Sequence, residues 1–417
     1  MRTSVPVMTC ALGVALALIG VTGCSSTESG SAVKAGTTPA ASVAPGQLNT
    51  GSYPTTPSAP LGNSADEQAG RQVEGRRMAG FVVGPWQVDP SLTRADTNGA
   101  TLMTDYKHLV AVRYPSTMYR VTSESMIVGF ASERWIADPK VPTKLRNAVL
   151  RFPDDVTAAT VAQGWTDGAL NMLVRPDDSQ DPVPAEPITT IPIPGHPEVT
   201  GVLFTFRDGD QTVREVSVAS GHGPYVLVQT ARAADTPEHA ADLIGRTLDL
   251  QIPLIDRFQP TDAALIRTLP LDPTGLVART LPAKTDPSAV RDGTYDAAGA
   301  LQLEQDPVGT GELFADAGVD VVSIRLATVF QARDSAGATR LATGLVAAAE
   351  KQPSSQPAAA VPALPDSRCV LMDDTGGLIP RYHCFATVDR YVFTVESRQS
   401  DTAGQQAAAQ YRILSAG

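Results

Sequence analysis

An internal repeat constrains the fold of this 417-residue chain more than any other feature of its sequence. The run Tyr225–Thr236 aligns with Tyr391–Thr402 at a constant spacing of 166 residues, with Tyr, Val, Arg, Asp and Thr at matching positions. In each copy a strand-like apolar run leads into a stretch whose apolar residues recur with a helical period. The chain is therefore predicted to contain two related modules that share this strand–helix unit.

A second pair of segments repeats upstream at a different spacing. Ala148–Phe152 leads into a helix expected from about Asp155. Ala327–Phe330 leads into a helix expected from about Asp334, at a spacing of 180 residues. Because the downstream spacing is 166, the second copy is about 14 residues shorter in between, and surface loops absorb such changes at little cost. Pro-rich connectors occupy this place in both copies, at residues 175–197 and 352–365.

The helices that follow the downstream strands carry N-terminal capping signals. Asp235 or Thr236 is expected to cap the first of them, with Pro237 in its first turn. Ser400 or Asp401 is expected to cap the helix in the second copy. These residues predict that the two helices begin at equivalent positions.

The order of elements indicates the fold class. Each copy is predicted to contain a strand, a helix, a Pro-rich loop, a three-stranded meander and a final helix. Antiparallel strands with helices on one face are typical of an α+β fold rather than of a doubly wound parallel sheet. We therefore expect two α+β modules, each an antiparallel β-meander packed with helices, over residues 61–258 and 259–417.

The N-terminus carries an export signal. Arg2 precedes a short apolar run at residues 11–20, which is too short to span a membrane and is typical of a cleavable signal peptide. It ends in Val21-Thr-Gly-Cys24, which resembles a bacterial lipobox, so residues 1–23 are the expected signal peptide and Cys24 the expected lipidation site. Two or three acyl chains, palmitate among them, would anchor the protein stably. An ordinary secretory signal with an incidental Cys is the alternative.

The residues after Cys24 have the composition of a disordered tether. Residues 25–60 are rich in Ser, Thr, Pro and Ala and show no hydrophobic period. We therefore expect the lipidated Cys and its tether to occupy residues 24–60.

Two cysteines remain for the folded body, because Cys10 lies in the signal peptide and Cys24 is the lipidation site. A single pair in an exported chain predicts a disulfide between Cys369 and Cys384. Their midpoint falls at Gly376-Gly377, in a turn between two apolar runs, so the pair should lie opposed across a β-hairpin. A metal site would need further ligands, and only His383 is near.

The 166-residue spacing extends this prediction to the first module. It aligns Cys369 with Leu203 and Cys384 with Val218. We therefore expect Leu203 and Val218 to be opposed across the corresponding hairpin, so that apolar packing replaces the cross-link there.

The search for chemistry gives few candidates. The sequence lacks the Gly-x-Ser-x-Gly, His-Glu-x-x-His, Walker and Cys-x-x-Cys motifs. Ser220 and His222 lie in an expected loop and could act as nucleophile and base, although a turn with a surface His explains them more simply. Asp373-Asp374 is expected to form a solvated turn rather than an acid/base pair. We therefore predict no catalytic residue and no cofactor.

Possible metal and nucleotide sites fail on their spacing. Asp96–Ala100 begins like a calcium loop, but Ala100 is no ligand and Lys107 stands where the bidentate Glu belongs. Gly309-Thr-Gly311 begins like a dinucleotide loop, but Phe314 replaces the third Gly, and a turn before a helix over Glu312–Ala317 is expected instead. No metal is predicted. The net charge of −11 argues against a nucleic-acid partner.

Two segments carry a family resemblance. Gly51–Pro57 with Pro60-Leu-Gly62, and Arg77-Met-Ala79 followed by Val82–Pro90, resemble a family of uncharacterised lipoproteins from mycobacteria and related actinobacteria. The resemblance runs over effectively the whole chain. It implies envelope location and lipid anchoring, and it implies no activity and no catalytic residues.

These observations favour a lipid-anchored protein on the extracytoplasmic face of the cell membrane. We expect a non-catalytic module that binds another envelope protein, a wall polymer or an apolar ligand. One alternative is an envelope hydrolase with a scattered active site. Another is a solute-binding lipoprotein, which should have two α/β lobes rather than the meanders predicted here.

Overall fold

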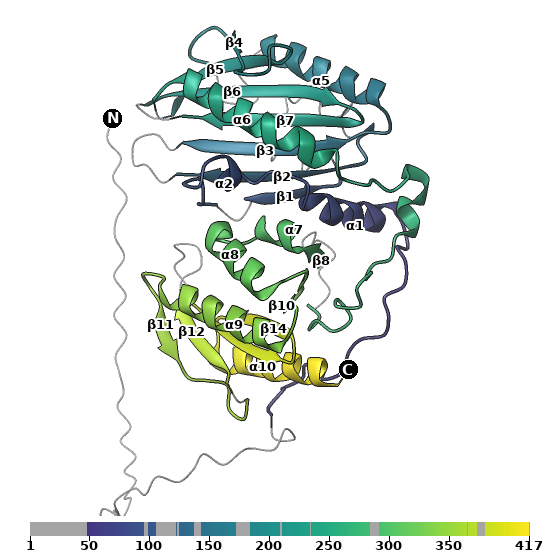
Figure 1. The fold of residues 1–417 in the computed structure, drawn as a ribbon, viewed down its shortest axis with the longest axis vertical. Coiled ribbons are helices and arrows are strands. Elements are labelled where there is room, and N and C mark those ends of the chain that lie inside the picture. Colours follow the sequence, from purple (N-terminus) through teal and green to yellow (C-terminus); the bar gives the residue numbers. More distant parts are fainter. Residues whose placement is uncertain are drawn as a thin grey trace, which may run out of the picture. The chain divides into compact units, whose positions relative to one another are not determined.

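A computed structural model describes residues 48–95, 99–105, 122, 125–136, 143–171, 184–208, 211–233, 235–283, 292–364, 366–372 and 380–416. Two antiparallel sheets of seven strands each carry the helices, which confirms the predicted α+β fold with two modules (Figure 1).

The first sheet has the strand order β1-β2-β3-β7-β6-β5-β4. Its strands are β1 (Ala100–Met103), β2 (Val128–Trp135), β3 (Lys144–Arg151), β4 (Thr189–Pro192), β5 (Thr200–Asp208), β6 (Gln211–His222) and β7 (Tyr225–Arg232). The second sheet has the same relative order, β8-β9-β10-β14-β13-β12-β11. Its strands are β8 (Gly293–Asp296), β9 (Val321–Ile324), β10 (Ala327–Gln331), β11 (Gln356–Ala358), β12 (Arg368–Met372), β13 (Arg381–Val388) and β14 (Tyr391–Ser397).

The strand register agrees with both repeat spacings. Arg151 pairs with Tyr225 in the first sheet, and Gln331 pairs with Tyr391 in the second. These pairs are related by 180 residues on one strand and 166 on the other. The two sheets therefore repeat one topology in one register at their centres.

Helices α5 (Asp155–Leu170) and α9 (Ser335–Glu350) also begin and end 180 residues apart. Each starts after an Asp whose carboxylate accepts a hydrogen bond from a backbone N–H in the first turn. Asp154 accepts from Thr157 at 2.7 Å, and Asp334 accepts from Gly337 at 2.7 Å. Such a cap satisfies a donor that the helix leaves unpaired.

Helices cover both faces of each sheet, so the expectation of one covered face was wrong. In the first sheet α5 packs on the face of Ala148 and Leu150, whereas α6 (Pro237–Ile255) packs on the face of Val149. In the second sheet α9 and α10 (Ser400–Ser415) divide the faces in the same way. The reason is that β2, β3 and β7 are buried almost throughout, which leaves no polar face for solvent.

The caps of the final helices differ from each other. Thr236 caps α6 as predicted, accepting from the backbone N–H of His239 at 3.2 Å. In contrast, α10 begins at Ser400 after Gln399, which makes no side-chain cap bond, so the predicted Ser400 or Asp401 cap was wrong.

The remaining helices lie before and between the strands. They are α1 (Glu67–Ala79), α2 (Pro85–Val88), η4 (Ala263–Thr268), α7 (Ala297–Leu301) and α8 (Pro307–Ala317). Gly309–Gly311 lies inside α8 rather than in a turn before it, because Asp306 caps that helix through the N–H of Gly309.

Each module buries a helix glutamine under the segment that leads toward its sheet. Gln251 of α6 donates to the carbonyl of Phe81 at 2.8 Å and accepts from the N–H of Val83 at 2.9 Å. Gln410 of α10 donates to the carbonyl of Arg279 at 2.9 Å and accepts from the N–H of Leu281 at 2.6 Å. The two modules thus repeat a side-chain contact as well as a topology.

The predicted disulfide is present. Cys369 and Cys384 lie directly opposite each other on β12 and β13, with their Cα atoms 4.1 Å apart. Both side chains are buried under α10. The predicted turn at Gly376-Gly377 lies outside the described residues.

The predicted pairing of Leu203 with Val218 was wrong. Leu203 of β5 pairs with Val216 of β6. The register places Gly201 opposite Val218, so Gly201 is the positional counterpart of Cys369. The cause is that the β5–β6 hairpin is two residues longer than the β12–β13 hairpin. A shift of two keeps each side chain on its predicted face.

Residues 48–64, which we call the arm, lie along the second module before the chain enters α1 (Figure 1). Leu48 is buried, and the N–H of Ser58 donates to the carbonyl of Ala278 at 2.8 Å. The tether expected over residues 24–60 is therefore packed chain from Leu48 onward. Residues 24–47 lie outside the described part.

Candidate functional site

Polar side chains gather at the end of the first sheet where β6 turns into β7. We call Glu74, Arg77, Arg151, Tyr225 and Thr261 the hairpin-end cluster. Helix α1 supplies Glu74 and Arg77 from successive turns, and β3 ends at Arg151, opposite Tyr225. Thr261 comes from the segment that follows α6.

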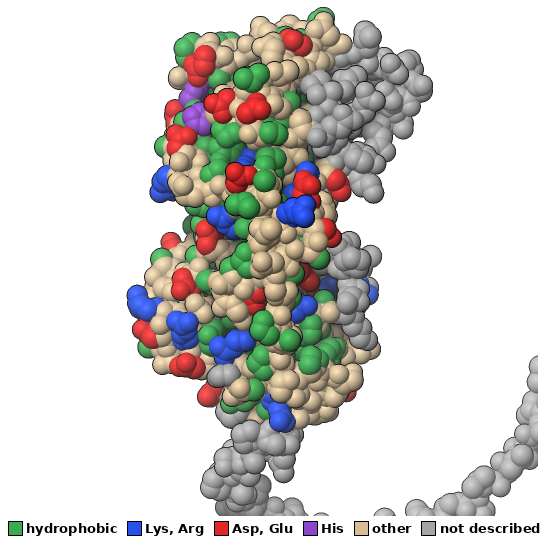
Figure 2. Space-filling model, turned by 90° about the vertical axis from the view of Figure 1, so that its right-hand side faces the viewer, with side chains coloured by type: hydrophobic (Ala, Val, Ile, Leu, Met, Phe, Trp, Pro, Cys, Tyr) green, Lys and Arg blue, Asp and Glu red, His purple; other side chains and the backbone are tan. Residues whose placement is uncertain are grey.

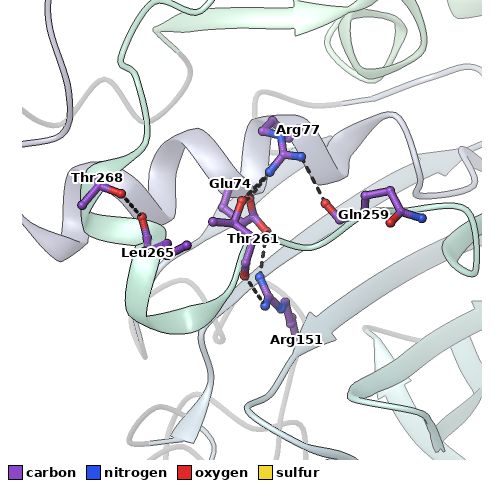
Figure 3. A network of polar contacts seen from close by, with 7 residues as sticks. All are labelled: Glu74, Arg77, Arg151, Gln259, Thr261, Leu265 and Thr268. Carbon is purple, nitrogen blue, oxygen red and sulfur yellow. Dashed lines mark hydrogen bonds and ion pairs between the residues drawn. The ribbon is translucent and has the colours of Figure 1, made fainter.

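Glu74 is the centre of this cluster and is fully buried (Figure 3). Its carboxylate lies 2.7 Å from Nη1 of Arg151 and 2.5 Å from Nη1 of Arg77. It also accepts from the backbone N–H of Thr261 at 2.8 Å and from its hydroxyl at 2.9 Å. Four donors therefore compensate the loss of hydration of one buried charge.

The arginines of the cluster also hold the segment after α6. Arg151 donates to the carbonyl of Thr261 at 2.5 Å, and Arg77 donates to the carbonyl of Gln259 at 3.1 Å. Backbone and side chain of this segment are thus fixed on α1 and β3. These contacts stabilise the fold, because each charged side chain among them binds another group of the protein.

The ionisation of the cluster agrees with that role. Burial lowers the pKa of Arg151, and the neighbouring Glu74 carboxylate opposes this. Burial raises the pKa of Tyr225. Its phenol therefore stays protonated at neutral pH and is unsuited to act as a general base there.

His222 lies beside this cluster, at the end of β6. Its Nε2 is 2.7 Å from Oδ1 of Asp256, the residue that follows α6. The Asp256 side chain is 57% exposed and that of His222 is 31% exposed, so water reaches the pair. The sequence did not predict this contact.

Ser220 does not complete a catalytic arrangement with His222. Both residues lie on β6, two positions apart, and the described contacts include no hydrogen bond between them. The expected loop was wrong, since β6 continues to His222 and only Gly223-Pro224 forms the turn. Gly221 serves close packing instead, because a Cβ there would lie 3.2 Å from Cα of Ala159 in α5.

A second polar site lies on the first sheet, on the same face as α5. It is a shallow hollow with about 10 Å³ of free space, room for roughly one water molecule. Glu133 lies 2.5 Å from Lys144, and Glu215 lies 2.6 Å from Arg232, whose guanidinium stacks on the ring of Phe206. Its lining consists of charged and hydroxyl side chains, namely Glu133, Lys144, Arg146, Glu215, Thr230 and Arg232.

The sequence analysis missed this charged hollow. Its residues come from four strands, and only the alternation Lys144-Leu145-Arg146 hints at a charged strand face. With three cations and two carboxylates, most of the charge is neutralised locally. The hollow has room for one water-sized polar group, and it is too small and too polar for an apolar ligand.

The other described histidines do not converge on one site. His196 lies between Glu198 and Asp249, His239 contacts Asp235, and His383 lies on β13. No group of three or more His, Cys, Asp or Glu side chains suited to a metal occurs among the described residues. Three positions considered in the sequence fall outside the described residues: Cys24, Asp96–Asn98 and Asp373-Asp374.

Charges on the surface are mixed. On the face shown in Figure 2, Lys and Arg side chains lie among Asp and Glu side chains. A nucleic-acid footprint would gather the basic side chains on one surface. Within the described ranges, no helix combines the length and hydropathy that crossing a membrane requires.

The comparison with solved structures finds the extracellular domain of PknH from Mycobacterium tuberculosis. The identity is 13%, and the match covers 42% of this chain and 94% of that chain with a TM-score of 0.28. The comparison with curated proteins finds no match.

Family comparison covers most of the chain. Residues 61–271 match the N-terminal domain of unknown function DUF7373, and residues 276–417 match the C-terminal domain of the same family. The two matches follow each other in the order of the two sheets. The chain belongs to the DUF7373 family.

Proposed function

We propose that this protein is a lipid-anchored lipoprotein of the actinobacterial cell envelope, held on the extracytoplasmic face of the membrane, whose modules bind a partner without catalysis. The observation that carries the proposal is Val21-Thr-Gly-Cys24 directly after a short apolar run. Small residues before a Cys at this place are what lipoprotein processing requires, and the resemblance to mycobacterial lipoproteins agrees with it.

The disulfide supports the extracytoplasmic location. Cys369 and Cys384 are bonded and buried in the second module. Disulfides of this kind persist in oxidising compartments and are rare in the cytosol.

The use of the polar groups supports binding rather than catalysis. Glu74 and Arg151 are committed to holding the segment at Thr261. The charged hollow favours a polar partner, such as another envelope protein or a wall polymer, over an apolar ligand.

One contact favours the hydrolase alternative. The contact between His222 and Asp256 is of the kind that a general base makes with its orienting carboxylate. Hydrolysis of ester substrates that is abolished by His222→Ala, and kept by His239→Ala, would establish this alternative.

The anchor is tested by partition and mass spectrometry. Wild-type protein should enter the detergent phase, with acyl chains on Cys24 as its first residue. Cys24→Ala should remain an unprocessed precursor, whereas Cys10→Ala, the matched control inside the signal peptide, should behave as wild type. Wild-type protein in the aqueous phase with an N-terminus beyond Cys24 would overturn the proposal.

A further inference from the structure

Helix α10, which follows β14, covers the disulfide of the second module. The cluster of buried residues around the two cysteines includes Ala403 and Ala407 of this helix. Cys369 is 7% exposed and Cys384 is 3% exposed. Because a reductant must attack a sulfur atom directly, it reaches this disulfide when the cover formed by α10 opens.

The start of α10 has weak local support. Gln399 precedes the helix with an extended backbone and makes no side-chain cap bond. Its side-chain oxygen instead accepts from the hydroxyl of Thr402 at 3.1 Å. Gly404 lies in the second turn, where glycine lowers the stability of a helix. In contrast, α6 of the first module begins with a Thr236 cap and Pro237.

Contacts with the segment before β8 hold the other half of α10. Arg279 donates to the carbonyl of Leu414 at 3.0 Å. Gln410 accepts from the backbone N–H of Leu281 at 2.6 Å. These contacts lie in the last two turns of the helix, so they fix its end rather than its start.

The arm contacts the first half of α10 at two neighbouring residues. The hydroxyl of Tyr53 accepts a hydrogen bond from Nε2 of Gln406 at 3.2 Å. A Cβ on Gly51 would lie 2.4 Å from Oε1 of Gln405. Leu48 joins the same buried cluster as the disulfide. The arm therefore lies against the half of α10 that lacks a side-chain cap.

A turn orders the arm at these contacts. The backbone N–H of Gly51 donates to Oδ1 of Asn49, and that of Tyr53 donates to the carbonyl of Thr50, both at 3.1 Å. Gly51 has a φ of +54°, a left-handed conformation that favours glycine. Because the turn fixes the backbone here, it places Tyr53 and Leu48 against the second module together.

From these contacts we infer that the arm is a strap that holds α10 closed over the disulfide, so that release of the arm exposes Cys369–Cys384 to a dithiol reductant. A thiolate of the reductant attacks one sulfur atom, the S–S bond breaks, and the other cysteine leaves as a thiolate that takes up a proton. The second thiol of the reductant then breaks the mixed disulfide. Two electrons pass to the cysteine pair, which ends as two thiols, and the dithiol becomes a disulfide.

The rate of reduction in the full-length protein tests the inference. Dithiothreitol is added under native conditions, and mass spectrometry follows the alkylation of the peptides that contain Cys369 or Cys384. Gly51→Val with Tyr53→Ala should release the arm and speed reduction about tenfold, which corresponds to about 1.4 kcal/mol of lost protection. Thr56→Ala, an exposed change in the same arm, should keep the wild-type rate. An unchanged rate in the released variant overturns the inference.

A cap variant tests whether the arm acts through α10. Gln399→Ser supplies the cap that this helix lacks. Added to the released variant, it should slow reduction about fivefold, the effect of a typical helix cap. If the added cap leaves the rate of the released variant unchanged, the arm does not protect the disulfide through α10.

Hydrogen exchange distinguishes a strap from general stabilisation. Release should speed amide exchange in residues 48–58 and in the first half of α10, and leave exchange in β9 and β10 unchanged. Faster exchange throughout the second module would mark a general loss of stability and overturn the inference. An arm that stays protected in the variant would contradict the holding contacts of Gly51 and Tyr53, and with them the strap.

Discussion

The two modules share topology and central register, yet different devices stabilise them. In the first module, the buried carboxylate of Glu74 ties α1 and β3 to the segment at Thr261. In the second, a disulfide joins β12 to β13.

The position of the disulfide shows why the first module lacks one. Its counterpart of Cys369 is Gly201, where a Cβ would lie 2.7 Å from the carbonyl oxygen of Ile191 and 2.8 Å from Cδ1 of Ile193. Ile193 thus fills the space that a cysteine would need. The comparison teaches that a repeated fold can fill one position by packing in one copy and by a covalent bond in the other.

The largest effect is expected at Glu74. Glu74→Gln keeps the shape of the side chain but leaves the guanidinium of Arg151 buried without its counter-charge, which costs about 3–5 kcal/mol. Denaturant unfolding should show the loss in the transition of the first module. The matched control is Glu67→Gln on the same helix, whose pair with Arg71 is exposed and contributes under about 1 kcal/mol. Equal losses of stability for the two variants would contradict the stabilising role of Glu74.

The next effect concerns the disulfide. Cys369→Ala with Cys384→Ala opens a loop of 15 residues and should lower the stability of the second module by about 3 kcal/mol on the chain-entropy model. The variant should keep its membrane location. Thermal unfolding followed in the presence and absence of reductant gives the measurement. If reductant still shifts the unfolding transition of the variant, the sensitivity to reductant does not come from the Cys369–Cys384 disulfide.

A smaller effect is expected where the first module has glycine. Gly201→Ala forces a Cβ against Ile191 and should cost about 1–3 kcal/mol, measured by denaturant unfolding. Gly404→Ala in α10 is the control, because its nearest neighbour would be 4.0 Å away and helix propensity then favours Ala. If Gly201→Ala leaves the free energy of unfolding unchanged, lack of space is not the reason why the first module has no disulfide.

The smallest effect concerns the repeated helix caps. Backbone hydrogen bonds from Thr157 and Gly337 lower the pKa of Asp154 and Asp334, respectively. A carboxyl with a lowered folded pKa stabilises the fold above its unfolded pKa of about 3.9, and this stability is lost as pH falls through the folded value. Asp154→Asn and Asp334→Asn should each flatten the acid limb of the stability curve by a similar amount. If only one of the two substitutions flattens this limb, the two caps do not make equivalent contributions to the pH dependence of stability.

The sequence predicted those parts of the fold that rest on local pattern. The 166- and 180-residue spacings hold in the register because Tyr225 and Tyr391 begin equivalent strands. The disulfide was predictable because the sequence carries an export signal and leaves two cysteines for the folded body. The pairing of Leu203 was not, because the two extra hairpin residues change the spacing to 168 between β5 and β12, whereas it stays at 166 between β6 and β13.

The polar sites depend on contacts that no local pattern reveals. Glu74 meets Arg151 and Thr261, which are 77 and 187 residues further along the chain. The glycines around His222 indicated a loop, yet Gly221 allows α5 to approach the sheet. The arm was missed because its composition is that of a linker, and only Leu48 and Tyr53 give it apolar contacts with the core of the second module.

Hydrogen exchange with and without reductant tests most directly that different devices hold the two modules. In the oxidised protein, the amides of β12 and β13 should exchange as slowly as those of β5 and β6. After reduction the account predicts faster exchange in β12 and β13 and unchanged exchange in β5 and β6. Equal acceleration in both hairpins, or none in either, would contradict it.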